Sequence, residues 1–338
     1  MKKLRIGVLG AGAIARGSHI PGYAASENCE LTAIADISPE SLAGVREKWQ
    51  FKKEYSDCSE LIQTEKPDLV SICLPNVYHA RYAIEAMEAG CDVILEKPVA
   101  TTLEDAIAIA DAQKRTGRKL AVCFSHRFNS MVIAAKKAVD AGAIGKPYMM
   151  RVRFAHGGPF PGWAVSDWFY DPERAGGGAV LDMGIHAMDL MLWFLGKATE
   201  VKGFAGTLRK DIAVDDNMTA LLKFGNDAMG YMECGWTSCA GFSGQEIMGD
   251  KGAITIDYSK GEVIQCSGVT SPDGSVKMEN QVIAKRGDLS AWQNQMAVFI
   301  EEKLADKEFS TSIQDGIEAL KIGLGVYESS LKGNTVKL

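Results

Sequence analysis

Several features that would place a chain in a familiar class are scarce or missing. Aromatic residues make up only 8% of the 338 residues, and the eight cysteines form no CxxC pair and no Cys/His spacing typical of a metal site. We therefore expect reduced thiols in an aliphatic core, in a cytoplasmic protein without a metal. Long runs of one charge and apolar stretches of membrane-spanning length are also lacking, which favours neither nucleic-acid binding nor membrane insertion. A small, polar substrate fits this composition better.

The chain divides into two regions of different periodicity. In residues 1–124 short apolar runs alternate with amphipathic segments, which is typical of an α/β domain with a doubly wound parallel sheet. The predicted strands of this region are residues 4–9, 31–35, 69–74, 92–95 and 120–124. Residues 125–338 carry alternating segments between glycine-containing turns, which predict a mainly antiparallel sheet in an α+β domain. Helical patterns return at 290–304 and 313–331, and this last helix is a candidate to pack back on the first domain.

A glycine-rich turn follows the first predicted strand. In Gly10-Ala11-Gly12-Ala13-Ile14-Ala15, Gly10 permits a tight turn, Gly12 allows close approach of a pyrophosphate, and Ala15 allows close helix packing. The free N–H groups of the helix start would face the phosphates. Because the motif lies between a strand and a helix, it predicts a dinucleotide-binding Rossmann domain rather than an ordinary turn.

The next predicted strand ends at Asp36, 26 positions after Gly10. Its carboxylate is suited to accept hydrogen bonds from the adenosine ribose and to repel a 2′-phosphate. Ile37 and Ser38 follow where an arginine would favour NADP. The sequence therefore favours NAD, while Arg16 and Arg46 keep NADP open.

Two further loops follow strands at the carboxyl edge of the predicted sheet, where α/β folds bind their ligands. Pro75-Asn76 with His79 is predicted to lie against the nicotinamide half of the cofactor, although Asn76 could simply cap a helix. Glu96-Lys97-Pro98 carries a lysine that can orient a substrate hydroxyl, and the alternative is a surface ion pair. The residues assigned to the cofactor are Gly10, Gly12, Ala13, Ile14, Asp36, Ile37, Pro75, Asn76, His79, Glu96, Lys97 and Pro98.

A carboxylate and an imidazole share one face of a predicted helix. Gly176-Gly177-Gly178 precedes the helical run 179–195, in which Asp182 and His186 are four residues apart. Positions i and i+4 lie side by side, and an aspartate neighbour can orient a histidine that titrates near neutrality. The alternative is a core histidine satisfied by Asp182 for structural reasons. Asp189 is interpreted as a structural partner.

The substrate-binding side is less specific. The Gly/Pro-rich segment 156–163 combines turns with aromatic faces suited to a sugar or cyclitol ring, and its alternative is a packed loop sealing the domain junction. The candidate substrate contacts are Arg127, Arg153, His156, Trp163 and Trp236.

These motifs, in this order, resemble the Gfo/Idh/MocA family over essentially the full chain. The matching features are 10–15, Asp36, 75–76 with His79, 96–98, Trp168-Phe169, 176–178, Asp182, Gly184, His186 and 327–329. The resemblance implies a Rossmann domain followed by an α+β domain with a large open sheet that often forms dimers or tetramers. It also implies a catalytic centre of Lys97, Asp182 and His186, in which His186 exchanges the hydroxyl proton, Lys97 polarises the oxygen and Asp182 holds both in register.

The resulting expectation is an NAD-dependent dehydrogenase acting on a secondary hydroxyl of a sugar, glycoside or cyclitol. Two alternatives stay open: an NAD-dependent glycosidase that oxidises its sugar transiently, and a non-catalytic NAD-binding regulatory protein. Net release of NADH would distinguish the dehydrogenase from the glycosidase. Tight NAD binding without turnover would indicate the regulatory protein.

Overall fold

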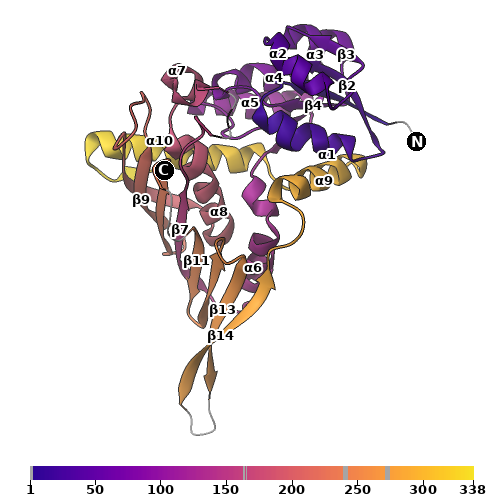
Figure 1. The fold of residues 1–338 in the computed structure, drawn as a ribbon. Coiled ribbons are helices and arrows are strands. Elements are labelled where there is room, and N and C mark those ends of the chain that lie inside the picture. Colours follow the sequence, from indigo (N-terminus) through magenta and orange to yellow (C-terminus); the bar gives the residue numbers. More distant parts are fainter. Residues whose placement is uncertain (1–2, 163, 165, 239–242, 271–274) are drawn as a thin grey trace. The chain divides into compact units, whose positions relative to one another are not determined.

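The computed structural model describes residues 3–162, 164, 166–238, 243–270 and 275–338. Within them the chain forms two compact units (Figure 1). The first unit contains the chain up to Phe124 together with residues 159–177 and 292–320, and the second contains 125–158, 178–291 and 321–338. The chain thus returns to the first unit twice. The return at 292–320 includes the beginning of the last helix, which the sequence placed as a candidate to pack back on the first domain, whereas the return at 159–177 was not predicted.

Long-range hydrogen bonds explain one of these returns. Thr311 lies beside strand β6 (Leu120–Val122), where its hydroxyl donates to the Val122 carbonyl at 2.7 Å. Lys303, in α9 (Ala291–Leu304), binds the buried Asp92 carboxylate at 2.5 Å. Such pairings between distant residues leave no mark in local periodicity.

The first unit is built on a six-stranded parallel sheet. Its strands are β1 (Leu4–Leu9), β2 (Cys29–Ala35), β3 (Lys53–Tyr55), β4 (Leu69–Ile72), β5 (Asp92–Leu95) and β6, in the order β3-β2-β1-β4-β5-β6. The order reverses between β1 and β4, which is the point where such sheets bind a dinucleotide. β4 and β5 are buried along their whole length, as a sheet covered on both faces requires.

The helices of this unit begin at the caps that local chemistry favours. Ser38, Asp57 and Thr102 accept the N–H groups of Ser41, Glu60 and Asp105. The helices are α1 (Ile20–Ala24), α2 (Pro39–Arg46), α3 (Cys58–Glu65), α4 (His79–Glu88), α5 (Leu103–Thr116), α7 (Pro172–Ala175), α9 and the beginning of α10 (Ile313–Lys332). A π-helical turn, η1 (Ala15–His19), precedes α1.

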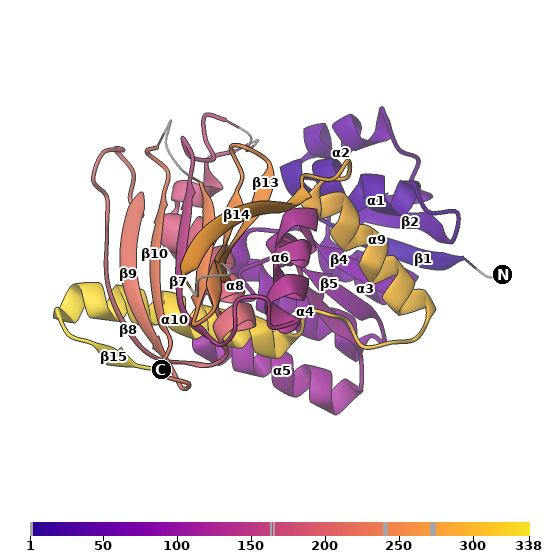
Figure 2. The same ribbon diagram turned by 90° about the horizontal axis from the view of Figure 1, so that it is seen from below.

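The second unit contains a nine-stranded sheet in the order β14-β13-β12-β11-β7-β10-β9-β8-β15. The strands are β7 (Pro147–Ala155), β8 (Ala198–Gly206), β9 (Asn217–Phe224), β10 (Met229–Gly235), β11 (Gly244–Gly249), β12 (Gly252–Asp257), β13 (Glu262–Thr270), β14 (Val276–Lys285) and β15 (Val336–Lys337). Only β7 and β10 pair in parallel, so the predicted mainly antiparallel sheet is confirmed. Figure 2 shows β8, β9, β10 and β7 side by side, and α8 (Ile185–Leu195) contacts β7.

The two faces of this sheet differ in polarity and exposure. Along β9 and β10 every second side chain is buried, including Met218, Ala220, Leu222, Met232 and Cys234. The intervening positions face away from that core and include large apolar side chains. Leu221 on β9 and Met229 on β10 are exposed to 58% and 52%, and Phe204 on the neighbouring strand β8 is exposed to 68%.

One segment is long and apolar enough to cross a membrane by length and composition, contrary to the sequence prediction. It spans Pro172–Leu195, and 83% of its most apolar window is buried inside the structure. Core helices of globular proteins have this property. The seven cysteines within the described residues are free thiols, and six of them are buried. Cys239 lies outside the described residues.

Candidate functional site

The turn after β1 has the geometry of a phosphate cradle. Gly10 has φ of +92°, and a Cβ atom there would lie 2.3 Å from the Cys73 carbonyl oxygen, so only glycine fits. At Gly12 a Cβ atom would meet nothing within 4 Å, which leaves open space beside the backbone. Ala13 and Ile14 are half-buried and Ala15 is buried. This combination of a closed turn and an open backbone fits a bound pyrophosphate.

Asp36 lies just past the end of β2 and braces this turn. Its two carboxylate oxygens accept the N–H groups of Ala11 and Ser38, both at 2.7 Å. Ile37 beside it is 87% exposed. The Nε–H of Arg46 donates to the Glu54 carboxylate at 2.9 Å, which directs one of the two arginines considered for NADP toward a carboxylate.

The loop after β4 is held by side chains that were assigned to the cofactor. Asn76 is buried, and its amide donates to the Ala175 carbonyl at 2.8 Å. The fully buried ring of His79 faces the carbonyls of Pro98 and Leu74 at 2.7 and 2.9 Å, and burial lowers the pKa of His79. Both side chains therefore brace the loops around Pro75, and we no longer expect them to contact the nicotinamide directly.

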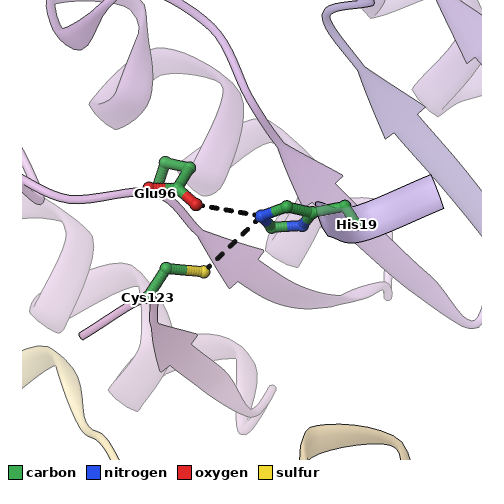
Figure 3. A group of neighbouring side chains, drawn as sticks. All are labelled: His19, Glu96 and Cys123. Carbon is green, nitrogen blue, oxygen red and sulfur yellow. Dashed lines mark hydrogen bonds and ion pairs between the residues drawn. The ribbon is translucent and has the colours of Figure 1, made fainter. Parts of the chain in front are cut away.

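The loop after β5 places Glu96 and Lys97 differently. Glu96 is buried, and one of its carboxylate oxygens accepts a hydrogen bond from the His19 ring at 2.9 Å (Figure 3), so its assignment as a cofactor contact stays a prediction. Burial opposes its charge, but the hydrogen bond from His19 holds the pKa of Glu96 below its usual range. Lys97 is half-buried and Pro98 is buried. Lys97 thus follows β5 at the carboxyl edge of the sheet that also carries the Gly10 turn.

In the second unit Asp182 lies in a π-helical turn, η5 (Val180–Gly184), that leads into α8. π-Helical turns are rare in proteins, and those that occur are often found at functional sites. Asp182 is buried and accepts the indole N–H of Trp236 at 3.0 Å. His186, in the first turn of α8, is also buried, and its ring centroid lies 4.6 Å from that of His126.

The beginning of this helical segment is anchored by residues that the sequence analysis missed. Asp215 accepts the N–H groups of Gly178 and Val180, both at 2.8 Å, and the hydroxyl of Tyr327 at 2.6 Å. Burial raises the pKa of Asp215 and that of Tyr327. A Cβ atom on Gly178 would lie 1.9 Å from the Asp215 carbonyl oxygen. The only signal in the sequence was Tyr327, as part of the motif 327–329.

Two predicted substrate contacts have partners inside the second unit. Arg127 is buried and forms a bidentate ion pair with Asp189, with N–O distances of 2.9 and 2.6 Å. This pairing agrees with the structural part expected of Asp189. Trp236 has no exposed surface, and its indole supports Asp182, so it offers no open face to a sugar ring.

Arg153, His156 and Trp163 are the other predicted substrate contacts, and their part in substrate binding stays a prediction. Arg153 binds Glu233 and Ser238, both at 2.9 Å. His156 accepts the Gly158 N–H at 2.9 Å and lies 3.0 Å from the Met183 sulfur. Trp163 lies outside the described residues. The sequence analysis also missed His126, which contacts Phe154 as well as His186 and lies 3.4 Å from the Tyr258 hydroxyl.

Comparison with known proteins agrees with a nucleotide cradle in the first unit. A family model described as an oxidoreductase family with an NAD-binding Rossmann fold matches residues 4–124, and one described as the GFO/IDH/MocA C-terminal domain matches 132–255. D-glucoside 3-dehydrogenase of Escherichia coli (strain K12) is 34% identical over 193 residues, which cover 57% of this chain and 54% of that protein. Myo-inositol 2-dehydrogenase of Thermotoga maritima is 26% identical over 341 residues, covering 99% and 98%.

The fold has a close counterpart among solved structures. Levoglucosan dehydrogenase, in complex with NADH and levoglucosan, has a TM-score of 0.88 at 24% identity, and the match covers 99% of both chains. The predicted fold class and the NAD cofactor are confirmed. The chain therefore belongs to the Gfo/Idh/MocA family of NAD-dependent oxidoreductases, and its first unit carries the NAD-binding Rossmann fold.

Proposed function

We propose that this enzyme transfers a hydride between NAD and a secondary hydroxyl of a sugar, glycoside or cyclitol, with Lys97, Asp182 and His186 as its catalytic residues. The observation that carries the proposal is the position of Lys97. It follows β5 at the carboxyl edge of the parallel sheet, the edge at which the Gly10 turn and Asp36 form the nucleotide cradle. An ammonium group at this edge is suited to meet the reactive end of a substrate beside the nicotinamide.

The three residues have separate tasks in this proposal. Bound NAD supplies the hydride acceptor or donor. Lys97 donates a hydrogen bond to the hydroxyl or carbonyl oxygen and stabilises its developing negative charge. His186 removes the hydroxyl proton during oxidation and returns it during reduction. Asp182, held by the Trp236 indole at 3.0 Å, orients the substrate and the imidazole.

The substrate class rests on the relatives and on the composition of the second unit. Relatives include proteins named D-glucoside 3-dehydrogenase and myo-inositol 2-dehydrogenase. Each name gives a hydroxylated ring as the substrate and a numbered position. The half-buried ring of His126 lies beside that of His186, with 4.6 Å between the ring centroids, and the half-buried Tyr258 lies 6.1 Å from His126. Aromatic faces suit the apolar face of a pyranose or cyclitol ring.

A substrate screen tests this function. The purified enzyme is incubated with NAD, and in parallel with NADP, against a panel of aldoses, glycosides and inositols, and reduced nicotinamide is followed by absorbance. We expect turnover with at least one polyol, with NAD preferred because the Asp36 carboxylate disfavours a 2′-phosphate. Release of a free sugar from glycosides without net NADH would contradict the dehydrogenase assignment, as would tight NAD binding with no turnover on any member.

We also propose that the enzyme assembles with copies of itself through the open face of the nine-stranded sheet. Phe204, Leu221 and Met229 expose large apolar surfaces there, which a monomer rarely leaves in contact with water. Light scattering at micromolar concentration should give a dimer or tetramer, and Leu221→Lys should shift the protein toward monomers. Only monomers of the unchanged protein at that concentration would contradict this proposal.

A further inference from the structure

A chain of buried polar side chains ends at the backbone of Lys97. The Tyr23 hydroxyl lies 2.6 Å from the Ser71 hydroxyl, which lies 3.0 Å from Nδ1 of His19. Nε2 of His19 lies 2.9 Å from Oε1 of Glu96, and Oε2 of Glu96 accepts the Lys97 N–H at 3.2 Å. His19 and Ser71 have no exposed surface, and Tyr23 and Glu96 have 1% and 7%. Three segments far apart in sequence, at residues 19–23, 71 and 96, thus converge under one loop.

The hydrogen bonds of this chain have a definite direction at its centre. Glu96 acts as an acceptor at both oxygens, because its pKa lies below the usual range and the Lys97 N–H can only donate. Nε2 of His19 therefore carries a hydrogen and donates a hydrogen bond to Oε1 of Glu96. Glu96 thus accepts one hydrogen bond from the buried ring of His19 and another from the backbone N–H of Lys97.

A contribution to the stability of the fold does not explain this row of buried polar side chains. Removing two charged groups from water is costly, and replacing a buried pair with apolar residues of similar volume is often neutral or stabilising. The strand positions next to Ser71 are apolar: Ile72 follows it, Ile94 is its partner on β5, and both have no exposed surface. A polar pair at this place is better explained by what it fixes, which is the loop that carries Lys97.

A metal ion would be another use of the same side chains. Nε2 of His19, Oε1 of Glu96 and Sγ of Cys123 lie within 4.8 Å of one another (Figure 3). The 2.9 Å between the nitrogen and the oxygen is, however, the length of a direct hydrogen bond. The geometry favours a hydrogen-bonded pair.

We infer that Glu96 and His19 are positioning residues that set the place of Lys97 for hydride transfer. The inference rests on the proposed function of Lys97. Glu96 fixes the backbone N–H of Lys97, and His19 fixes the carboxylate of Glu96, so neither residue needs to contact the substrate or NAD. Loss of either should lower kcat and leave the affinity for NAD nearly unchanged.

Two variants separate positioning from a merely structural role. Glu96→Leu removes the acceptor of the Lys97 N–H and leaves His19 buried without its carboxylate, so we expect a lowered melting temperature and a kcat lowered about 100-fold, as for a misplaced catalytic group. His19→Phe combined with Glu96→Leu replaces the whole pair with apolar groups. We expect this double variant to regain most of the melting temperature and none of the kcat. A structural role would restore both together.

Glu96→Gln serves as the conservative rescue, because its amide oxygen can still accept the Lys97 N–H. It should retain clearly more kcat than Glu96→Leu. The dissociation constant of NAD, measured by protein fluorescence, should match that of the unchanged enzyme in all three variants. A kcat that recovers in the double variant, or an NAD affinity that falls in parallel with kcat, would overturn the inference.

Two controls keep the outcomes distinct. If Lys97→Met leaves turnover unchanged, the proposed function fails; if Lys97→Met abolishes turnover while Glu96→Leu does not lower kcat, only the positioning inference fails. Elemental analysis of the purified protein addresses the metal. One equivalent of zinc that disappears in His19→Phe would overturn the hydrogen-bonded pair in favour of a metal site.

Discussion

Replacing Lys97 by methionine should lower kcat about 1000-fold, because a charged donor aimed at the reacting oxygen accounts for a rate factor of that order. Methionine keeps the length and apolar stem of the side chain but has no ammonium group. The cradle of Gly10, Gly12 and Asp36 is untouched, so the affinity for NAD should hardly change. Initial rates on an accepted polyol and a fluorescence titration with NAD measure the two quantities.

A matched control lies in the same unit. Lys119 is a half-buried lysine whose ammonium group binds Asp306 at 2.6 Å, and no part of the proposed mechanism uses it. Lys119→Met should leave kcat near the level of the unchanged enzyme. An equal loss in both lysine variants would indicate damage to the fold and would refute the part given to Lys97.

The same experiment extends to His186. His186→Ala should cost about 1000-fold in kcat, since a positioned general base contributes about 10²–10⁴-fold. If the two groups act on one oxygen, the double variant should be little slower than the slower single variant. Losses that multiply in the double variant would mean that Lys97 and His186 act in separate steps or at separate places.

Gly178→Ala is the second large effect we expect. The added Cβ would lie 1.9 Å from the Asp215 carbonyl oxygen and 3.0 Å from the Asp215 nitrogen, and backbone atoms cannot rotate out of the way. The substitution should lower the free energy of unfolding by about 3 kcal/mol, at the upper end of overpacking costs. It should also lower kcat, because the displaced N–H groups of Gly178 and Val180 anchor the segment that carries Asp182.

Urea unfolding measures this loss, and Gly157→Ala is its control. A Cβ atom on Gly157 would meet nothing within 4 Å, so that variant should unfold at the urea concentration of the unchanged protein or slightly above it. A Gly178→Ala protein as stable as the control would show that the Asp215 anchor is not as tight as described.

Helices and strands whose apolar residues lie on one face, or fill the whole element, could be predicted from the sequence. The predicted ranges for β1 and β5 agree with the structure at both ends. β14 was missed because nearly all its described side chains are exposed or half-buried, so no apolar periodicity marks it. β3, with only three residues, carries too little pattern to stand out.

The motif residues of the site could be predicted from the sequence, but the residues that hold them by hydrogen bonds could not. Lys97, Asp182 and His186 belong to short local patterns. His19 lies 77 residues from Glu96, and Asp215 lies 112 residues from Tyr327, so these partners meet only in the folded chain. Arg127 and Trp236 were chosen as substrate contacts because their side chains are long and polar or aromatic. Arg127 binds Asp189, 62 residues away, and Trp236 binds Asp182, 54 residues away, and such pairings cannot be read from residue type.

The account depends most on the meeting of Lys97 and His186 at one substrate oxygen. A crystal structure of the ternary complex with reduced nicotinamide cofactor and an accepted polyol tests it directly. We expect Nζ of Lys97 and a ring nitrogen of His186 within about 3.2 Å of the same hydroxyl oxygen, the distance of a productive hydrogen bond. A complex in which the two groups face different cavities, or in which only one of them reaches the substrate, would contradict the proposed mechanism.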